Sequence, residues 1–420
     1  MPQSRPAPIA IVGGGPCGLT FARLLELAGI DYVVFERDES AEPKLTHQGG
    51  SLDLHPGTGQ TALEAAGLKD EFEKVARYEA DIFSLQDFKG DHQFRQGGEL
   101  VEGDGDRPEI DRRQLRDLLL NSLPKERVRW GKTLKSVEQE GGEEAGAAGC
   151  VLRFADGSSE RGFRLIVGAD GAWSKVRPLI TPVKPRYSGR VYIEGRLPPG
   201  NPQYAAAQKL AGPGTFMACG AGRVLVMQQQ SDRSYRIYSG MEEPESLTKP
   251  GGALDFAADV EKSRAALLEL FPDWAPHLRA LIENAEGPWR VWSLYTFDAD
   301  VFSPEAEGRT WVRTPGVTLL GDAAHVALPN GEGVNLAMLD SLKLFECLSA
   351  ELGKQGGAFD ARADAAIIER AIVAYETEMR KRAGEHVEDG FKMNDIMFKA
   401  DGAQRMIAFF QQFTDAAGQS

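Results

Sequence analysis

The chain has 420 residues, and at roughly 150 residues per domain this length predicts two or three domains. Its net charge of −14 disfavours nucleic acid and anionic membranes as partners, although it leaves room for a local basic pocket. No apolar run approaches the ~20 residues that cross a bilayer, and the start of the chain has no signal-peptide pattern. The four cysteines are scattered without a CxxC pair, which favours neither disulfides nor a zinc site and fits a cytoplasmic protein.

The stretch from Ile9 to Glu36 predicts a strand, a glycine turn, a helix and a second strand. Gly13, Gly15 and Gly18 have the GxGxxG spacing that lets the backbone approach a pyrophosphate. Glu36 ends the second strand, where an acid can accept the hydroxyls of a ribose. The glycine spacing alone is weak evidence. The strand before it, the helix after it and the acid at this distance together favour a dinucleotide site.

The following segments combine short strands and helices. Residues 52–54 predict a short strand, where Asp53 by itself reads as a solvated residue, and residues 56–66 predict a turn and a helix. Residues 80–101 alternate as paired strands do, with a hairpin turn at residues 89–91. Residues 112–123 predict an amphipathic helix that begins with Arg112. A cation there opposes the helix dipole, so this side chain is either exposed or faces an anion.

Two later stretches resemble the opening one. After predicted strands at 128–130, 134–138 and 150–154, residues 165–177 predict an apolar strand, a turn with Asp170 and Gly171, and the start of a helix capped by Ser174. Residues 317–341 predict a buried strand that ends in Gly321 and Asp322, a glycine-containing loop and a long helix from about Val334. A helix N-terminus that follows a glycine-containing loop stabilises a negatively charged group bound there.

Between these stretches, residues 180–300 change in character. Pro and Gly are frequent, short strands are interrupted by a helical segment near 254–270, and the strands read as antiparallel. This pattern indicates a sheet domain inserted into the first domain. Residues 359–420 predict mostly helices, which would cover the two preceding domains.

Three stretches together, GGGPCG with Glu36, GADGAWSKVR and LLGDAAH, resemble the three fingerprints of the class A flavoprotein monooxygenases, the p-hydroxybenzoate-hydroxylase-like family. More narrowly, GGSLDLHPGTGQ, RPEIDRRQLRDLLLNSL and GDAAH are similar to the tetracycline-inactivating flavin monooxygenases. The resemblance implies an α/β fold: a Rossmann-like FAD-binding domain, an inserted, mainly antiparallel β-sheet substrate domain and a C-terminal helical segment. On this basis the FAD-binding domain comprises residues 1–79, 106–179 and 301–355, the substrate domain residues 80–105 and 180–300, and the helical region residues 356–420.

The resemblance also implies which residues contact the cofactor. Gly13, Gly15 and Gly18 would hold the FAD pyrophosphate and Glu36 the adenosine ribose, with Arg37 and the backbone of Leu134 beside the adenine. Asp53 and Arg112 match family residues that contact FAD, and Asp322 would bind the ribityl chain or the pyrophosphate. Gly333, Val334 and Asn335 would stabilise negative charge at the flavin N1–O2 edge. Asp170 and Gly171 would serve the FAD turn and the use of NAD(P)H.

The reaction that the resemblance implies needs no protein nucleophile. NADPH or NADH reduces FAD, O2 adds at flavin C4a, and the hydroperoxide hydroxylates or epoxidises an aromatic or polycyclic small molecule. We therefore assign no catalytic side chain and no metal, and we interpret His325 of GDAAH as structural rather than proton-transferring. We expect a monomer or a weak dimer.

The sequence departs from the family on the substrate side. An amide side chain and an arginine used by the tetracycline-inactivating relatives align with Glu194 and Thr215. The loop Pro329–Gly333 reads PNGEG, one residue shorter than the family's P-x-x-G-x-G. These departures predict a different aromatic or polycyclic substrate, with Glu194, Thr215 and Pro329 as candidate substrate-side residues.

Other functions on this scaffold are less favoured. A flavin halogenase would carry WxWxIP, whereas residues 289–292 read only WRVW. An oxidoreductase or oxidase that inserts no oxygen remains the main alternative, and a redox-sensing FAD binder that signals through a partner is another. Incorporation of oxygen-18 into the product distinguishes a monooxygenase from an oxidoreductase or oxidase that inserts no oxygen. Steady NADPH turnover distinguishes an enzyme from a redox sensor.

Overall fold

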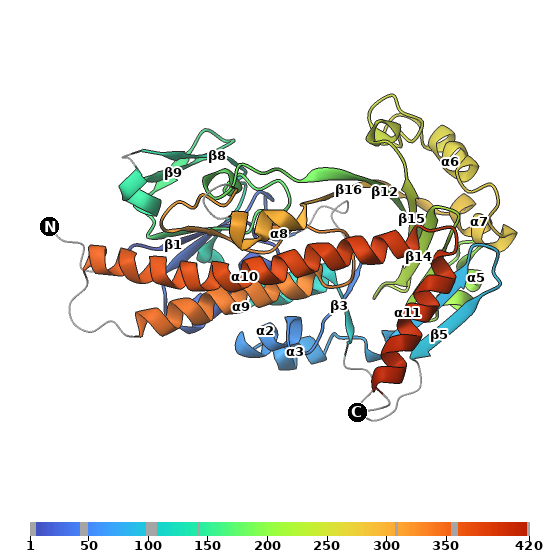
Figure 1. Ribbon diagram of the computed structural model, residues 1–420, viewed down its shortest axis with the longest axis horizontal. Coiled ribbons are helices and arrows are strands. Elements are labelled where there is room, and N and C mark those ends of the chain that lie inside the picture. Colours follow the sequence, from blue (N-terminus) through green and yellow to red (C-terminus); the bar gives the residue numbers. More distant parts are fainter. Residues whose placement is uncertain are drawn as a thin grey trace.

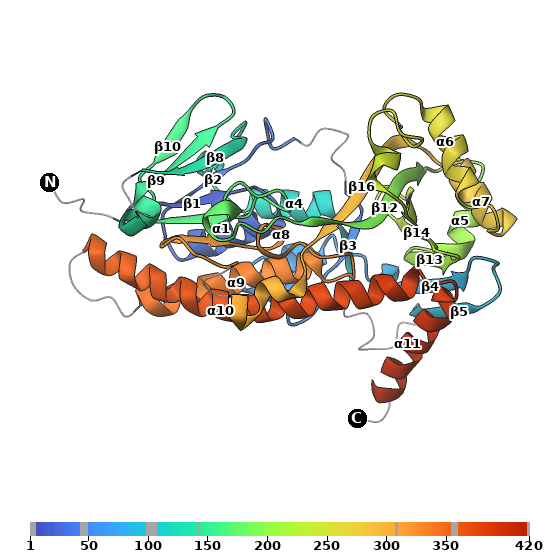
Figure 2. The same ribbon diagram turned by 45° about the horizontal axis from the view of Figure 1, so that its top comes forward.

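The computed structural model describes residues 6–42, 49–97, 107–140, 143–306, 310–353 and 360–417. In these ranges a parallel sheet and a larger mixed sheet lie at opposite ends of an elongated molecule (Figures 1 and 2). The 37-residue helix α10 (Ala361–Met397) runs along the long axis from one end to the other. The predicted domain boundaries near residues 105 and 355 fall outside the described residues, so the division at those numbers remains a proposal.

The parallel sheet has five strands in the order β17-β11-β1-β2-β7. Its strands are β1 (Ile9–Val12), β2 (Tyr32–Phe35), β7 (Val128–Arg129), β11 (Leu165–Gly168) and β17 (Val317–Leu319). The apolar runs predicted at β1 and β11 are fully buried, as expected for parallel strands covered on both faces. Beside it lie a three-stranded antiparallel sheet and two helices, α1 and α9, that pack against each other. They are β8 (Leu134–Gln139), β9 (Cys150–Phe154), β10 (Ser159–Arg161), α1 (Pro16–Leu27) and α9 (Gly333–Leu352).

A two-stranded ribbon lies between the two large sheets, and three helices pack beside α1 and α9. They are β3 (Ser51–Asp53), β6 (Glu109–Asp111), α2 (Gly59–Ala65), α3 (Lys69–Glu73) and α4 (Arg112–Asn121). The predicted strand, turn and helix of residues 52–66 are confirmed, as is the helix that begins at Arg112.

The larger sheet has seven strands in the order β16-β12-β15-β14-β13-β4-β5. Its strands are β4 (Ile82–Asp87), β5 (Gln93–Gly97), β12 (Arg186–Leu197), β13 (Thr215–Gly220), β14 (Arg223–Gln229), β15 (Tyr235–Glu242) and β16 (Glu286–Thr296). Only the β4–β13 pairing is parallel, so the predicted mainly antiparallel sheet is confirmed. Residues 82–97 thus belong to the same sheet as residues 186–296.

Helices cover both faces of this sheet. On one face an apolar cluster includes Phe216, Ile237 and Trp274, together with residues of three short helices. These helices are α5 (Tyr204–Ala211), α6 (Val260–Glu269) and α7 (Pro276–Glu283). On the other face Met397 at the end of α10 and Met406 of α11 (Gly402–Ala417) pack against the sheet. Across the described ranges, no helix has both the length and the apolarity to cross a membrane.

The segment after β11 differs from the prediction. Ser174 does accept hydrogen bonds, from the amides of Val176 and Arg177 at 3.1 and 3.0 Å, but only a 3-10 turn follows, at Arg177–Leu179. Pro182 disfavours the helical conformation at the residue before it, which explains why the turn does not extend into a helix. Other 3-10 turns lie at Tyr78–Ala80, Lys125–Arg127, Glu143–Gly149, Glu245–Thr248, Ala299–Phe302 and Pro304–Ala306.

Candidate functional site

The glycine turn between β1 and α1 combines tight packing with an open position. A side chain at Gly13 would lie 2.2 Å from the carbonyl oxygen of Ala169, and Gly13 has a φ of +112°. A side chain at Gly18 would lie 2.1 Å from the carbonyl oxygen of Gly13. Nothing lies within 4 Å of a side chain placed at Gly15. No side chain caps α1 at Gly15, so its first amides are available to an anion. This turn therefore has the form of a phosphate cradle.

Glu36 lies directly beside that turn. Its carboxylate accepts hydrogen bonds from the amides of Gly14 at 2.5 Å and Asp38 at 2.9 Å, and the residue is only 7% exposed. Each carboxylate oxygen has further acceptor capacity, which suits a ribose diol. Arg116 of α4, which the sequence reasoning missed, donates to the Gly14 carbonyl at 3.2 Å and to Asp38 at 2.8 Å. Its position on a distant helix has no sequence signal of its own.

The two residues predicted near the adenine lie just after Glu36 and at the start of β8. Arg37 is exposed, and Leu134 is buried at the start of β8. The Lys132 amide, two residues before Leu134, donates to the Glu36 carbonyl at 2.7 Å. The structure therefore brings Leu134 close to the Glu36 turn.

Asp53 and Asn335 meet although 282 residues separate them in sequence. The buried Asn335 side chain donates to the Asp53 carbonyl at 2.9 Å and accepts from the His55 amide at 2.8 Å. Asn335 lies in the first turn of α9, two residues after Gly333, and a side chain at Gly333 would meet nothing within 4 Å. The open, glycine-lined N-terminus of α9 is thus fixed against the end of β3.

Arg112 begins α4 beside the segment that precedes β3. Its amide donates to the Gly50 carbonyl at 3.2 Å, and a side chain at Gly49 would lie 2.2 Å from the Arg112 Cδ. Gly50 also lies against the seven-stranded sheet, because a side chain at Gly50 would come within 2.4 Å of the hydroxyl of Tyr238 in β15. Gly49 and Gly50 therefore permit a close approach of Arg112, β3 and the sheet.

Asp322 is the exposed first residue of α8 (Asp322–His325). The preceding Gly321 has a φ of +56°, and its amide donates to the buried Asp340 of α9 at 3.1 Å. His325 shares Asp340, with 2.6 Å between its Nε2 and the Asp340 carboxylate. The 3% exposure of His325 and this partner agree with a structural role for the histidine.

Arg177 joins the Asp170–Gly171 turn to the Asp322 turn, which sequence reasoning did not foresee. Its buried guanidinium donates to the carbonyls of Ala172 at 2.7 Å, Ala323 at 2.8 Å and Asp322 at 3.2 Å. Burial lowers the pKa of Arg177 to about 10, which still leaves it charged at neutral pH. One cation thereby fixes two of the three fingerprint turns.

The substrate-side candidates Glu194 and Thr215 lie on one face of the seven-stranded sheet. Glu194 pairs across the strands with Tyr238, Val226 and Met217 in turn, and Thr215 lies two residues before Met217. Pro329 is placed separately, where its carbonyl accepts from the Asn394 side chain of α10 at 2.9 Å. The structure thus brings two of the three onto one surface.

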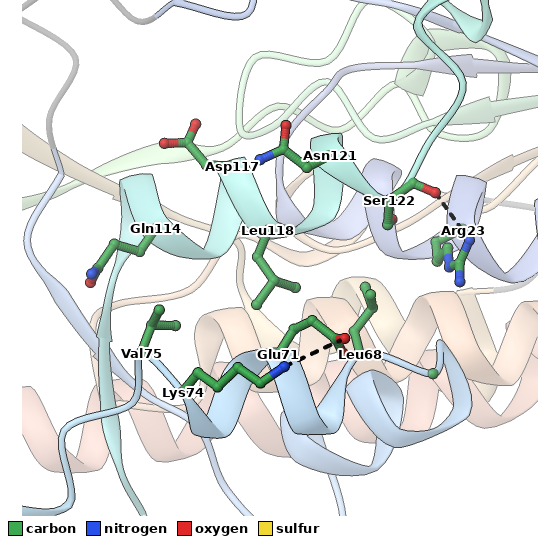
Figure 3. A pocket seen from close by; sticks show the side chains of 11 residues that line it. Arg23, Leu68, Glu71, Lys74, Val75, Gln114, Asp117, Leu118, Asn121 and Ser122 are labelled. Atoms are coloured by element: carbon green, nitrogen blue, oxygen red, sulfur yellow. Dashed lines mark hydrogen bonds and ion pairs between the residues drawn. The ribbon is translucent and has the colours of Figure 1, made fainter.

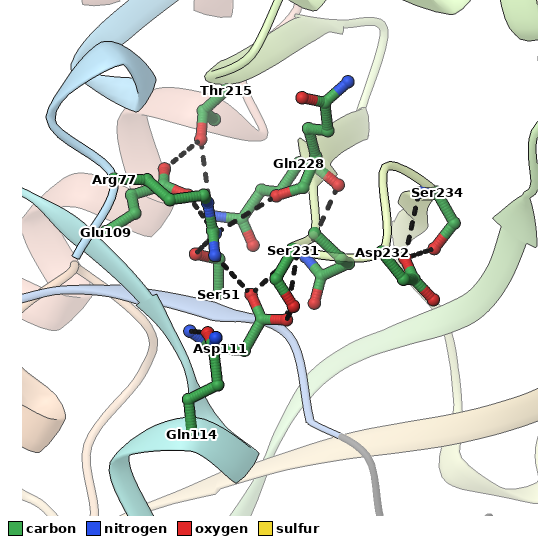
Figure 4. A network of polar contacts seen from close by, with 12 residues as sticks. Ser51, Arg77, Glu109, Asp111, Gln114, Thr215, Gln228, Ser231, Asp232 and Ser234 are labelled. Carbon is green, nitrogen blue, oxygen red and sulfur yellow. Dashed lines mark hydrogen bonds and ion pairs between the residues drawn. The ribbon is translucent and has the colours of Figure 1, made fainter. Parts of the chain in front are cut away.

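Both sheet residues already have polar partners. The fully buried Glu194 accepts from Arg236 at 2.5 Å and from the Trp292 Nε1 at 2.7 Å, so its negative charge is neutralised within the protein. Thr215 donates to Glu109 at 3.3 Å and accepts from Gln228 at 3.3 Å (Figure 4). Because Glu109 is the cross-strand neighbour of Asp53, the network in Figure 4 connects the seven-stranded sheet to the β3–β6 ribbon.

A separate surface cavity of about 590 Å³ lies between α3 and α4 (Figure 3). Arg23, Lys74, Asp117 and Leu118 are among its lining residues, and none of the predicted site residues lines it. It has no part in the site described above.

The comparisons with known proteins agree with this geometry. The sequence matches the FAD binding domain family over residues 6–195 and 297–381, on either side of most of the seven-stranded sheet. Monooxygenase asqM of Emericella nidulans is 31% identical over 429 residues, covering 90% of this chain and 93% of asqM. HpxO of Klebsiella pneumoniae, solved with FAD and uric acid, has a TM-score of 0.71 at 25% identity and covers 96% of this chain and 92% of its own.

Tetracycline destructase Tet(51) superposes with a TM-score of 0.66, covering 97% of this chain and 96% of its own. At 16% identity this likeness shows the fold alone. The family match, the identity to asqM and the shared fold lead to one conclusion. This chain belongs to the FAD binding domain family and is an FAD-dependent monooxygenase.

Proposed function

We propose that the enzyme uses NADPH or NADH and O2 to hydroxylate or epoxidise an aromatic or polycyclic small molecule. The observation that carries the proposal is the meeting of the β3 end, the α9 N-terminus and the substrate sheet around Gly50, Asp53 and Asn335. Bound FAD supplies the electron transfer and the oxygen activation. The protein supplies binding, orientation and charge.

We assign the FAD contacts to the predicted site residues described above. Gly13, Gly15 and Gly18 hold the pyrophosphate at the N-terminus of α1, and Glu36 accepts the ribose hydroxyls. Arg37 and Leu134 flank the adenine. Asp53, Arg112 and Asp322 bind the middle and flavin end of the cofactor. Gly333, Val334 and Asn335 present the α9 N-terminus to the flavin, where partial positive charge favours a reduced, anionic ring.

The substrate would occupy the sheet face between Glu194, Thr215 and the Pro329 loop. Uric acid in HpxO is a flat, polar heterocycle, which supports an aromatic substrate class for a chain of the same fold and family. Tyr238 and Trp292 on this face offer flat apolar surfaces with polar atoms, which suits such molecules.

The test uses purified protein with its cofactor. We expect a yellow protein that releases intact FAD on denaturation and oxidises NADPH or NADH faster when an aromatic substrate is added. Under oxygen-18 gas, one labelled atom should enter the product. An oxidised product without the label, formed with an equivalent amount of peroxide, would instead indicate an oxidase.

Location and assembly belong to the same proposal. All four cysteines are free thiols, which fits the reducing cytoplasm. A monomer or weak dimer remains our expectation, and light scattering at two protein concentrations would test it.

A further inference from the structure

A histidine outside every assigned role links the two segments that meet at the flavin end of the site. His55 follows β3, and its side chain is 8% exposed. One ring nitrogen, Nε2, lies 2.7 Å from the Asp53 carboxylate, and the other, Nδ1, lies 2.9 Å from the Glu332 carboxylate. Glu332 directly precedes the first residue of α9.

This geometry determines the charge of the ring. A carboxylate accepts hydrogen bonds, and a neutral imidazole has only one N–H, so both contacts are satisfied only when His55 is an imidazolium. Burial opposes the charge, but the hydrogen bonds with Asp53 and Glu332 outweigh it and raise the pKa of His55 to about 9. The His55 ring is therefore protonated and positively charged at neutral pH.

The connection between the segments does not depend on that cation. Asn335 already joins them, because it bonds both the Asp53 carbonyl and the His55 amide. A side chain at Gly59 would come within 2.5 Å of the Asn335 Oδ1, so the surrounding packing also holds this amide in place. What the imidazolium adds is charge. Without it, Asp53 and Glu332 would place two negative charges beside the N-terminus of α9 and offset its positive potential.

We propose that His55 is a positioning residue for the flavin end of the site: its imidazolium offsets the negative charge of Asp53 and Glu332 and so keeps the α9 N-terminus favourable to the reduced flavin ring. The inference rests on the proposed function only in placing the flavin at α9. It assigns His55 and Glu332 a joint role in setting how strongly the protein prefers reduced over oxidised FAD.

The test measures the midpoint potential of bound FAD by dye-equilibrated spectral titration. We expect His55→Gln to weaken binding of reduced relative to oxidised FAD about tenfold, a fall of about 30 mV for a two-electron couple. Glu332→Gln should shift the preference in the opposite direction by about threefold, because its side chain is 37% exposed and partly screened. The double variant restores the parent's net charge, so its preference should return to within about threefold of the parent.

His92→Gln is the matched control, since His92 lies between β4 and β5, faces Asp87 at 4.0 Å and should change nothing. Thermal melting of each apoprotein checks the fold independently. Equal potentials in all variants, or shifts of the same sign in His55→Gln and Glu332→Gln, would overturn the inference. A parent protein that binds no FAD would instead refute the proposed function.

Discussion

At the scale of single residues, Glu36 has a carboxylate whose orientation is set by the protein backbone. The backbone amides of Gly14 and Asp38 orient its carboxylate. We expect Glu36→Ala to weaken FAD binding at least tenfold, because a charge-assisted hydrogen bond is worth about 1.5–3 kcal/mol and 1.4 kcal/mol is a decade. Titration of apoprotein with FAD, followed by flavin fluorescence, measures this. Asp31→Ala, a nearby exposed carboxylate paired with Arg127, is the control and should bind FAD normally. Parent-like affinity in Glu36→Ala would refute the ribose assignment.

Glu109 is a second residue whose environment gives a measurable result. Burial raises its pKa to about 7, against the opposing effects of its hydrogen bonds and of Arg77. The folded state therefore binds this proton more tightly than the unfolded state, whose pKa is about 4.5. The contribution of Glu109 to the free energy of unfolding should fall as pH rises from about 4.5 to about 7, by on the order of 3 kcal/mol, and stay level above that.

The measurement compares urea unfolding of the parent and Glu109→Gln across this pH range. The glutamine cannot titrate, so the difference between the two proteins isolates the carboxyl group. A difference that does not change between pH 4.5 and 7 would show that Glu109 keeps an ordinary pKa.

At the scale of elements, the parts predicted from the sequence are those with local signals. Each glycine turn, with its preceding strand, is encoded within about 20 residues, so β1, β2, β11 and β17 were predictable. The hairpin of β4 and β5 was predictable for the same reason: Gly90 takes a φ of +86° in the expected turn.

The remaining features depend on contacts between distant segments. The parallel pairing of β4 with β13 joins Phe83 to Thr215 across more than a hundred residues, and no periodicity reveals it. The same holds for His55 and Arg177, whose roles arise from the elements packed around them. The prediction of a helix after Gly171 was wrong. Ser174 does accept a backbone hydrogen bond as a cap would, but a 3-10 turn forms in place of the helix, and Pro182 follows it.

Arg177 provides the element-scale prediction. Replacing it with lysine leaves several carbonyls of the two turns without donors, and each buried unsatisfied group costs about 1–3 kcal/mol. We expect Arg177→Lys to lower the free energy of unfolding by about 2–4 kcal/mol and to weaken FAD binding through the displaced Asp322 turn. Chemical unfolding of the apoprotein and FAD titration measure the two effects.

The control for that experiment is Arg186→Lys. Arg186 makes a bidentate pair with Asp298 at the surface, where such pairs contribute about 1 kcal/mol or less. If both lysine variants lose the same small amount of stability, Arg177 does not hold the turns together.

At the scale of the whole molecule, helix α10 connects the core around the parallel sheet to the seven-stranded sheet. Its first half belongs to the core around the parallel sheet through residues such as Tyr375 and Met379. Near its end Asn394 bonds the Pro329 carbonyl, and Met397 packs on the seven-stranded sheet. The loop before α9 and the seven-stranded sheet are therefore held by one element.

This arrangement also bears on the choice of substrate. The fold is shared with Tet(51). On the resemblance to the tetracycline-inactivating monooxygenases, Glu194 and Thr215 are the predicted substrate-side positions, and we expect both to offer little to a tetracycline. Glu194 is already bound by Arg236 and Trp292, and Thr215 replaces a guanidinium with a hydroxyl placed between Glu109 and Gln228. Loss of one charged hydrogen bond costs about 1.5–3 kcal/mol, which is tenfold or more in affinity. We therefore expect tetracycline to be a poor substrate compared with a smaller planar aromatic compound.

The assay incubates holoenzyme, NADPH and O2 with tetracycline, or with members of a panel of hydroxylated aromatic and heteroaromatic acids. Mass spectrometry follows loss of each compound and gain of one oxygen atom, while peroxide measurement reports uncoupled NADPH oxidation. We expect slow, poorly coupled oxidation with tetracycline and tighter coupling with at least one panel compound. Rapid and well-coupled conversion of tetracycline would contradict the prediction, because it would require polar contacts that Glu194 and Thr215 are in no position to make.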